Sequence, residues 1–378
     1  MKMGWIRTGV LVGFFLSLII SRTMITPPIF TDASSTSNAE QSRQFSARLS
    51  ERTDFENEST DLIANVFYRN LHNLYKSMAP SGASGMNVLW ERNQAKVWYI
   101  EEQLPCEEAI IGGLVKDDSQ AIAAGFKMMD WGFAHQDTDG SFQGTGDAFH
   151  STSFFVEAVA RSLLVIQQSP QSRQYAAQVA HYTPLVHRAA RWMISPDVWN
   201  RGTKRNQPYT HRRYLVATAL GLTGKLTGDQ VLMNYGRQSI KDGLSLQLPN
   251  GVNPEKGGYD SSYQMVGVFY AERWVRYFPK DSLSPKVIAM INRALSWEET
   301  RITPLGKIRN DGNTRTAGQE TTRSGKVKKV SYRSVFRGFA DWASLTGDKK
   351  WEGIARRIAQ YYIPNTNLSA LKKWLLKT

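Results

Sequence analysis

Cysteine is almost absent from the 378-residue sequence: Cys106 is the single one, so no disulfide can form within the chain. The chain is therefore neither a disulfide-stabilised scaffold nor a protein with a cysteine-cluster zinc site. Acidic residues are also outnumbered, because 33 Asp and Glu stand against 47 Lys and Arg and give a net charge of +14. This excess favours an acidic partner, such as nucleic acid, an anionic membrane surface or an acidic polysaccharide.

Several chemical motifs are missing too. The sequence has no P-loop, dinucleotide fingerprint, HExxH motif or paired-cysteine metal site, and its six histidines are scattered. We therefore expect no cofactor, although a structural calcium ion held by loop carboxylates stays open. Helix-turn-helix, zinc-finger and RNP patterns are also absent, so nucleic acid is not an expected partner. An acidic polysaccharide is the partner that we expect.

The N-terminus carries an export pattern. Lys2 and Arg7 precede the apolar run of residues 9–20, and Arg22 follows it. The run is shorter than the about 18 apolar residues that span a bilayer, and it suits the apolar region of a secretory signal. Residues 1–26 are predicted to be a cleaved signal peptide or an uncleaved membrane anchor, with a buried helix as the alternative. The protein is expected to be exported, and to be periplasmic, membrane-anchored or extracellular.

The rest of the chain divides at a change of composition. Residues 27–59 are polar and predict a disordered linker. From residue 60 the apolar side chains recur at helical spacing, and strand patterns are few. We expect one all-α domain over residues 60–378, with helices over 119–136 and 209–222 and a polar loop over 201–208. Further helices are expected to begin at Ser151 or Thr152, and at Asp260 or Ser261.

Long loops of similar sequence form a weak internal repeat. The loop of residues 139–159 and that of residues 250–268 share an Asp/Asn-Gly turn, a Gly-rich middle, an Asp, and a Ser and an aromatic that open a helix. A longer third copy covers residues 310–336. Helical hairpins with short turns on one side and long loops on the other predict an α/α toroid, an incomplete barrel of helical hairpins. A solenoid of helical repeats is the alternative.

These motifs resemble a known family. The helical pairs, the DGSF loop at 139–142, the GGYDSSYQ stretch at 257–264 and the Tyr-Thr-His stretch at 209–211 resemble the α/α-toroid polysaccharide lyases. That group includes the toroid domains of alginate, heparin and chondroitin/hyaluronan lyases, and the toroid of certain glycoside hydrolases is similar. The resemblance implies that an Asn, a His and a Tyr face one cleft. Here Asn206 lies five residues before His211 instead of beside it.

Cleavage of a uronate polymer by β-elimination would give several polar side chains of the chain a chemical role. The reaction needs a group that binds the uronate carboxylate, a base for the C5 proton and an acid for the leaving oxygen. A phenol can be base and then acid where cations lower its pKa. Residues 248–268 and 206–213 supply the candidates: for catalysis Tyr263, Tyr259 and His211, and for binding Asn206, Arg212, Lys256 and Asn253. Tyr263 is favoured, because it stands at the start of a helix.

Two other functions stay open. A toroid glycoside hydrolase would use a pair of carboxylates, for which Asp147 and Glu255 are the candidates. A non-catalytic glycan-binding or polysaccharide-assembly protein would need neither. His150 and Trp131 are candidate sugar contacts whichever function holds. Structural roles are the alternatives for the other residues: Asp147 also suits a helix cap, and the tyrosines and His211 also suit packing positions.

The positive charge is concentrated near the C-terminus. Residues 301–350 contain twelve Lys or Arg and four Asp or Glu, a net charge of +8. Such a stretch lines a cleft for an anionic polymer or forms a solvated loop. We expect it to face the loop of residues 248–268 across one cleft.

Overall fold

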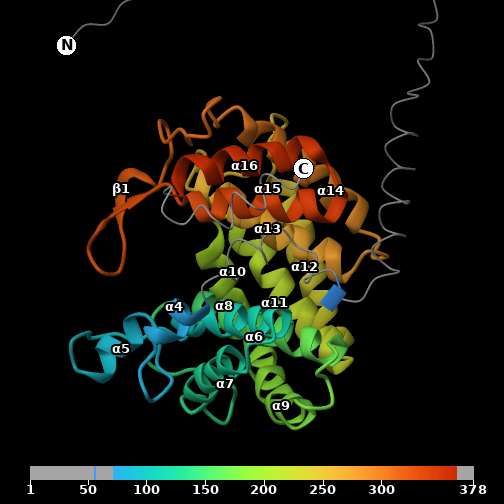
Figure 1. Cartoon of the computed structure of the whole chain (residues 1–378). Helices are drawn as coiled ribbons and strands as arrows, with labels where there is room; N and C mark the ends of the chain where they lie inside the picture. The colour runs from blue at the N-terminus through green and yellow to red at the C-terminus, as the bar shows by residue number, and fades with distance from the viewer. Residues whose placement is uncertain (1–54, 57–70, 364–378) are drawn as a thin grey trace, which may run out of the picture.

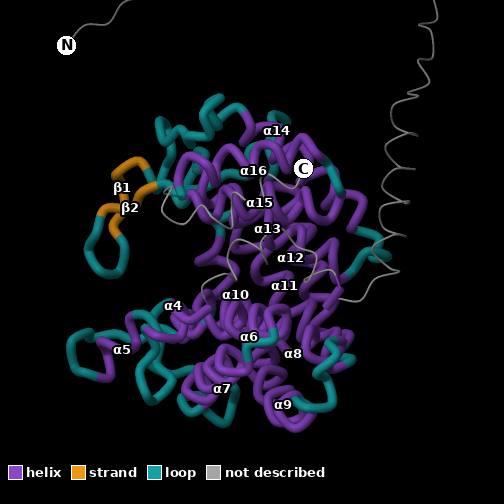
Figure 2. The backbone as a smooth tube through the Cα atoms, viewed as in Figure 1, coloured by secondary structure: helices purple, strands orange, loops and turns teal. Residues whose placement is uncertain are grey.

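The computed structural model describes residues 55–56 and 71–363. The expected signal or anchor, residues 1–26, lies outside the described residues, as does the expected linker apart from residues 55–56. The described part is mostly helical, as the sequence predicts (Figures 1 and 2).

The elements follow one another with few strands between them. The helices are α4 (Leu71–Lys76), α5 (Met86–Glu91), the 3₁₀ helix η2 (Ile100–Gln103), α6 (Pro105–Lys116), α7 (Ser119–Phe133), α8 (Ala148–Gln168), α9 (Ala176–Met193), α10 (Pro196–Asn206), α11 (His211–Thr227), α12 (Gln230–Leu246), α13 (Ser261–Tyr277), α14 (Ser284–Glu299), α15 (Tyr332–Thr346) and α16 (Lys349–Tyr362). The strands β1 (Ala317–Thr321) and β2 (Val327–Lys329) form an antiparallel hairpin.

Most of these helices pack as consecutive pairs. The pairs are α6 with α7, α8 with α9, α11 with α12, α13 with α14, and α15 with α16. The first member of each pair also packs on the first member of the next, so α6, α8, α11, α13 and α15 form one row. Figure 1 shows α7 and α9 at one end of the molecule and α14 and α16 at the other. The two ends of the row approach each other where Arg333 of α15 lies 3.5 Å from Glu108 of α6.

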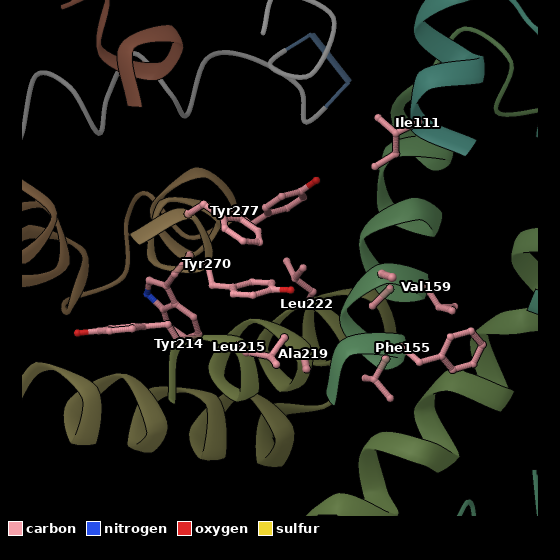
Figure 3. Packing of buried hydrophobic residues seen from close by; sticks show 14 of the residues in the cluster. Ile111, Phe155, Val159, Tyr214, Leu215, Ala219, Leu222, Tyr270 and Tyr277 are labelled. Atoms are coloured by element: carbon pink, nitrogen blue, oxygen red, sulfur yellow. The ribbon is translucent and has the colours of Figure 1, made fainter. Parts of the chain in front are cut away.

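The core lies between the helices of this row. Figure 3 shows Phe155 and Val159 of α8, Leu215 and Leu222 of α11 and Tyr270 of α13 among the packed side chains. Among the described residues, α8 is the one helix long and apolar enough to cross a membrane, and 94% of its apolar window is buried inside the fold. A helix that is apolar on all sides is expected in the core of a large domain.

A buried ionic network joins three helices of the row. Arg273 of α13 binds Glu157 of α8 at 2.6 Å and Glu107 of α6 at 2.6 Å. Arg161 of α8 also binds Glu107. All four side chains are at most 7% exposed. Because each charge is paired away from water, the network holds α6, α8 and α13 in one arrangement.

Five turns of the described residues share two hydrogen bonds, in which the first N–H donates to the fifth carbonyl and the fourth N–H donates to the first carbonyl: residues 79–83, 137–141, 248–252, 303–307 and 322–326. The last is the turn of the β1–β2 hairpin, where a Cβ at Gly325 would meet nothing within 4 Å. The other four mark the internal repeat. In these four the fourth residue is a glycine with φ between 88° and 103°: Gly82, Gly140, Gly251 and Gly306. A Cβ there would meet the backbone carbonyl of Lys127, Arg188, Arg293 or Arg357, respectively. Positive φ and this close approach both require glycine.

Two copies of the repeated turn differ from the expectation: one lies elsewhere in the sequence and one was not predicted. The turn of the third copy is centred on Gly306, and Gly312 of the expected copy is not its equivalent. The copy at residues 79–83 carries no Asp/Asn-Gly pair, so the sequence pattern missed it.

Two helix boundaries were also predicted wrongly. The helix expected to begin at Ser151 or Thr152 begins at Ala148, and the side chain of Asp147 makes no capping hydrogen bond. The expected loop at 201–208 is largely helix α10, because Pro196 starts a helix that buries Trp199 and Gly202 against α8. Asp260 is confirmed as the cap of α13, where its carboxylate accepts the N–H groups of Ser262 and Tyr263.

Candidate active site

A cleft of about 680 Å³ lies among η2, α8, α11, α13, α15 and the β1–β2 hairpin. Five of the candidate residues line it or reach it, and the basic stretch supplies a further wall. The acidic, basic and histidine residues that line the cleft, together with Tyr263, are Glu101, Glu102, Glu108, Asp147, His150, His211, Arg212, Tyr263, Arg315, Arg323, Lys328, Arg333 and Arg337.

His211 is the first residue of α11, and Glu255 fixes its ring. The loop that holds Glu255 is fastened to the start of α11, where the Thr210 hydroxyl donates to Pro254 O at 2.6 Å. Glu255 Oε1 lies 2.7 Å from His211 Nδ1 and accepts the His211 backbone N–H at 3.1 Å. Because Oε1 is already an acceptor, Nδ1–H is the natural donor, and Nε2 of the neutral ring is left unprotonated.

Burial governs the ionisation of this pair. Burial raises the pKa of the fully buried Glu255 carboxyl to about 8. Burial, and then the positive charge of Arg315, lowers the pKa of His211 well below its usual value. His211 is therefore a neutral imidazole at neutral pH, which suits a proton acceptor.

Tyr263 lies beside His211 in the first turn of α13. The centroids of the two rings are 4.9 Å apart. Lys328 Nζ donates to the Tyr263 hydroxyl at 3.1 Å. The guanidinium of Arg315 lies 3.5 Å from the centroid of the phenol ring. Positive charge is thus concentrated where negative charge on the phenol oxygen would need stabilising.

Arg315 is held in place by the residue that caps α13. The second carboxylate oxygen of Asp260 accepts the backbone N–H groups of Arg315 at 3.0 Å and Thr316 at 2.8 Å. The Arg315 side chain binds Glu320 through Nε at 3.2 Å, and its Nη1 lies 3.6 Å from Glu255 Oε2. A single carboxylate therefore sets the start of α13 and the arginine above Tyr263 together.

Arg212 supplies a second cation. Its Nη1 donates to Asn206 Oδ1 at 3.0 Å and to Asp147 Oδ2 at 3.2 Å, and its guanidinium stacks on Tyr209. Asp147 thus serves as an ion-pair partner and does not cap a helix. Asn206 itself does not line the cleft, and its amide oxygen contacts the site only as an acceptor for Arg212.

His150 faces the same cleft from α8. Its ring centroid is 6.2 Å from that of His211. Its Nδ1 has no hydrogen-bond partner among the described residues. Burial, followed by the charge of Arg212, lowers the pKa of His150 well below the usual value. His150 is therefore a neutral imidazole in the cleft lining whose Nδ1 is buried without a partner, which leaves the ring free to adopt the tautomer that a bound molecule requires.

The structure places the other candidates outside the cleft lining. The hydroxyl of Tyr259 donates to Asp311 O at 3.0 Å, and its ring packs on Trp297. Asn253 is buried, and its backbone N–H donates to Gln264. Trp131 is buried too and donates from its indole to Glu91. Lys256 binds Glu320 of the hairpin, and Glu320 also binds Lys328 at 2.6 Å. Lys256 therefore contacts the site only indirectly, through Glu320.

Sequence reasoning did not single out Arg315, Lys328, Arg323 and the glutamates of η2. The available signal was the charge of residues 301–350, which marked the stretch without saying which cation meets which helix. In the described chain, residues 55–56 and 71–363, no group of three or more His, Cys, Asp or Glu is arranged to hold a metal ion.

Comparison with protein-family models, with curated proteins and with solved structures found no match. The functional proposal therefore depends on the geometry of the cleft and on the chemistry of its residues.

Proposed function

We propose that the protein is a polysaccharide lyase-like enzyme that cleaves an acidic, uronate-containing polysaccharide by β-elimination. The observation that supports this most is the meeting of His211 and Tyr263, 52 residues apart in sequence, under Arg315 and Lys328. Two groups able to move protons and two cations then share one cleft, which is what elimination next to a carboxylate requires.

The residues divide the chemistry between them. Arg315 and Arg212 bind the uronate carboxylate and withdraw charge from it, which makes the C5 proton more acidic. The unprotonated Nε2 of His211 accepts that proton. The electrons form the C4–C5 double bond as the bond from C4 to the glycosidic oxygen breaks. The Tyr263 hydroxyl, held by Lys328, donates a proton to the leaving oxygen.

The finer fold proposal is the α/α toroid. The five consecutive helix pairs, the row of first helices and the approach of Arg333 to Glu108 support an arc that nearly closes on itself. The four recurring turns support a repeat built from helical hairpins. With the N-terminal apolar run, this favours an exported enzyme of the periplasm, the cell envelope or the extracellular space.

The geometry favours a lyase over a hydrolase. Glu255 is fully buried and engaged with His211, while Asp147 binds Arg212 and Arg205. Two carboxylates that flank a glycosidic bond must both reach it, and here one of them cannot.

The decisive experiment compares two tyrosines. Purified protein is incubated with a panel of anionic polysaccharides, and the ultraviolet absorbance of the unsaturated product is followed. Tyr263→Phe should remove this activity while the variant still binds the polymer. Tyr259→Phe is the matched control, because its hydroxyl lies outside the cleft lining and should leave the rate within about twofold.

The opposite outcomes are equally clear. New reducing ends without the absorbance would indicate a hydrolase, and binding without any cleavage would indicate a glycan-binding protein. Undiminished absorbance with Tyr263→Phe would remove Tyr263 from the mechanism.

A further inference from the structure

The β1–β2 hairpin connects the two walls of the cleft. Its turn carries Arg323, which binds Glu101 and lies 2.9 Å from Glu102 Oε1, both in η2. The Arg323 guanidinium also lies 3.5 Å from the ring centroid of Tyr99. Figure 1 shows the hairpin extending from the C-terminal half of the molecule on the side where α4 and α5 lie. Residues more than 200 positions apart in sequence thus meet across the site.

The two walls carry opposite charges. One wall has the glutamates of η2 and Glu108 of α6, and the other has the cations of the hairpin and α15. Arg333 of α15 faces Glu108 at 3.5 Å, a second and looser pair across the cleft. Burial raises the pKa of Glu101, so its carboxylate is in an unfavourable place to hold charge without the arginine.

These glutamates are unexpected in a cleft proposed to bind a polyanion. Acidic side chains repel such a substrate unless cations neutralise them. Each of them faces an arginine that a carboxylate of the substrate would also bind. Arg323, Glu101 and Glu102 are 29%, 18% and 22% exposed, so water reaches the pairs. Burial raises the pKa of Glu101, so a Glu101 that loses the guanidinium can take up a proton instead of holding an unpaired charge.

The basic wall extends beyond the reacting sugar. Tyr263, Val266, Phe269 and Tyr270 line the cleft along α13. Arg337 lies 4.9 Å from the ring centroid of Phe269. Six residues of helix separate Tyr263 from Phe269, a distance of about 9 Å along the axis. Cations therefore continue past the place where one uronate would be bound by Arg315.

We propose that Arg323 is a second substrate-binding residue, and that its guanidinium exchanges Glu101 and Glu102 for a carboxylate on a sugar next to the one that reacts. This rests on the proposed function. The substrate class that fits is a polymer with carboxylates on neighbouring sugars, because an isolated uronate would leave Arg323 with its glutamates. The hairpin is thereby part of the binding site. Glu101 and Glu102 occupy its arginine until a carboxylate of the polymer replaces them.

A thermodynamic cycle tests the exchange. All variants are made in the Tyr263→Phe background, and binding to polygalacturonate and to alginate is measured by calorimetry at fixed salt. Arg323→Ala should weaken binding roughly tenfold, and Arg323→Lys less. Glu101→Gln with Glu102→Gln should tighten it. Arg323→Ala should weaken binding by a larger factor in the Glu101→Gln/Glu102→Gln background than it does alone. In that background Arg323 has no charged glutamates to leave, so its whole interaction with the polymer contributes to affinity.

The matched control is Arg237→Ala. Arg237 binds Asp281 at 2.6 Å and does not line the cleft. Its replacement by alanine removes the same charge as Arg323→Ala. Thermal melting of each variant checks that it is folded.

Three results would overturn the inference. If Arg323→Ala and Arg237→Ala weaken binding equally, Arg323 contributes net charge alone. If the loss on Arg323→Ala vanishes in the Glu101→Gln/Glu102→Gln background, Arg323 is a structural latch and not a ligand. In both cases the parent protein still binds the polymer and the proposed function stands. If the parent protein binds neither these polymers nor other anionic polysaccharides, the proposed function fails together with the inference.

Discussion

The ring centroids of His211 and Tyr263 lie 4.9 Å apart, at the starts of two neighbouring helices. Gly267, one turn after Tyr263, makes this possible. A Cβ at Gly267 would lie 3.3 Å from His211 Cα, so even a methyl group would be tight and a larger side chain would require the two helices to move apart. The close approach of α13 to α11 therefore depends on a glycine that carries no chemistry of its own.

Enlarging Gly267 should separate the two rings. Gly267→Leu is expected to push α13 away from α11 and to lower the catalytic rate by more than about tenfold, because misplacing reacting groups by about 1 Å can cost two orders of magnitude. Gly353→Ala on α16 is the control, since the nearest atom to its Cβ would be 3.9 Å away and alanine favours a helix. Steady-state kinetics and thermal melting separate the two effects, and an active, well-folded Gly267→Leu would contradict this account.

Glu255 should control the pH dependence of the rate. Its pKa is raised to about 8, so the carboxyl becomes ionised as pH passes that value. The ionised form accepts a stronger hydrogen bond from His211 Nδ1–H and makes Nε2 more basic, so kcat/KM should rise through pH 8. Glu255→Gln keeps the shape but cannot ionise, and this rise should disappear.

The control for that profile is Glu298→Gln, whose carboxyl also has a pKa raised to about 8 but does not line the cleft. An unchanged profile with Glu255→Gln, or a changed one with Glu298→Gln, would remove Glu255 from this role.

Glu298 should instead affect stability. Burial raises its pKa from 4.5 to about 8, so between these values the folded state holds a proton that the unfolded state has released. The free energy of unfolding therefore falls as pH rises through this window. Glu298→Gln stays neutral and should be more stable than the parent protein above pH 8 by up to about 5 kcal/mol, since the pKa of Glu298 lies about 3.5 above its usual value and each pKa unit corresponds to about 1.4 kcal/mol, with little difference near pH 4. Urea unfolding at both pH values measures this, and an equal difference at both would refute it.

The buried ionic network should be sensitive to the loss of one charge. Arg273→Leu leaves Glu107 and Glu157 buried without the arginine that joins them. Removing one partner of a buried pair costs about 3–5 kcal/mol. Lys349→Leu, whose 80% exposed side chain loses an ion pair with Glu352 within α16, should cost about 1 kcal/mol or less. Similar midpoints of denaturation for the two variants would show that the network is not a stabilising element.

Several features followed from local sequence. The cap at Asp260 was predicted because a carboxylate before an apolar helix accepts the free N–H groups of its first turn. The turns at Gly140 and Gly251 were visible because glycine tolerates the positive φ that they need. Helix α10 was missed, since its polar composition resembles a loop and two of its three buried residues, Trp199 and Gly202, pack against α8.

The site itself was predicted only in part. Tyr263 was favoured over Tyr259, four residues before it, because the sequence placed Tyr263 at the start of a helix. Only packing showed that this helix lies against His211 and that Tyr259 turns toward Trp297. Glu255 was read as a catalytic carboxylate, and its burial behind His211 shows it as the group that orients the imidazole.

The sequence by itself determined most of the helices, the cap at Asp260 and the turns at Gly140 and Gly251, because those depend on the conformational preferences of neighbouring residues. It also determined the excess of positive charge. The tertiary structure alone decided that Arg315 and Lys328 reach Tyr263 and that Arg323 reaches η2, since these contacts join residues between about 50 and 220 positions apart in sequence. Such contacts depend on how the helical pairs pack in space, and no local pattern specifies that.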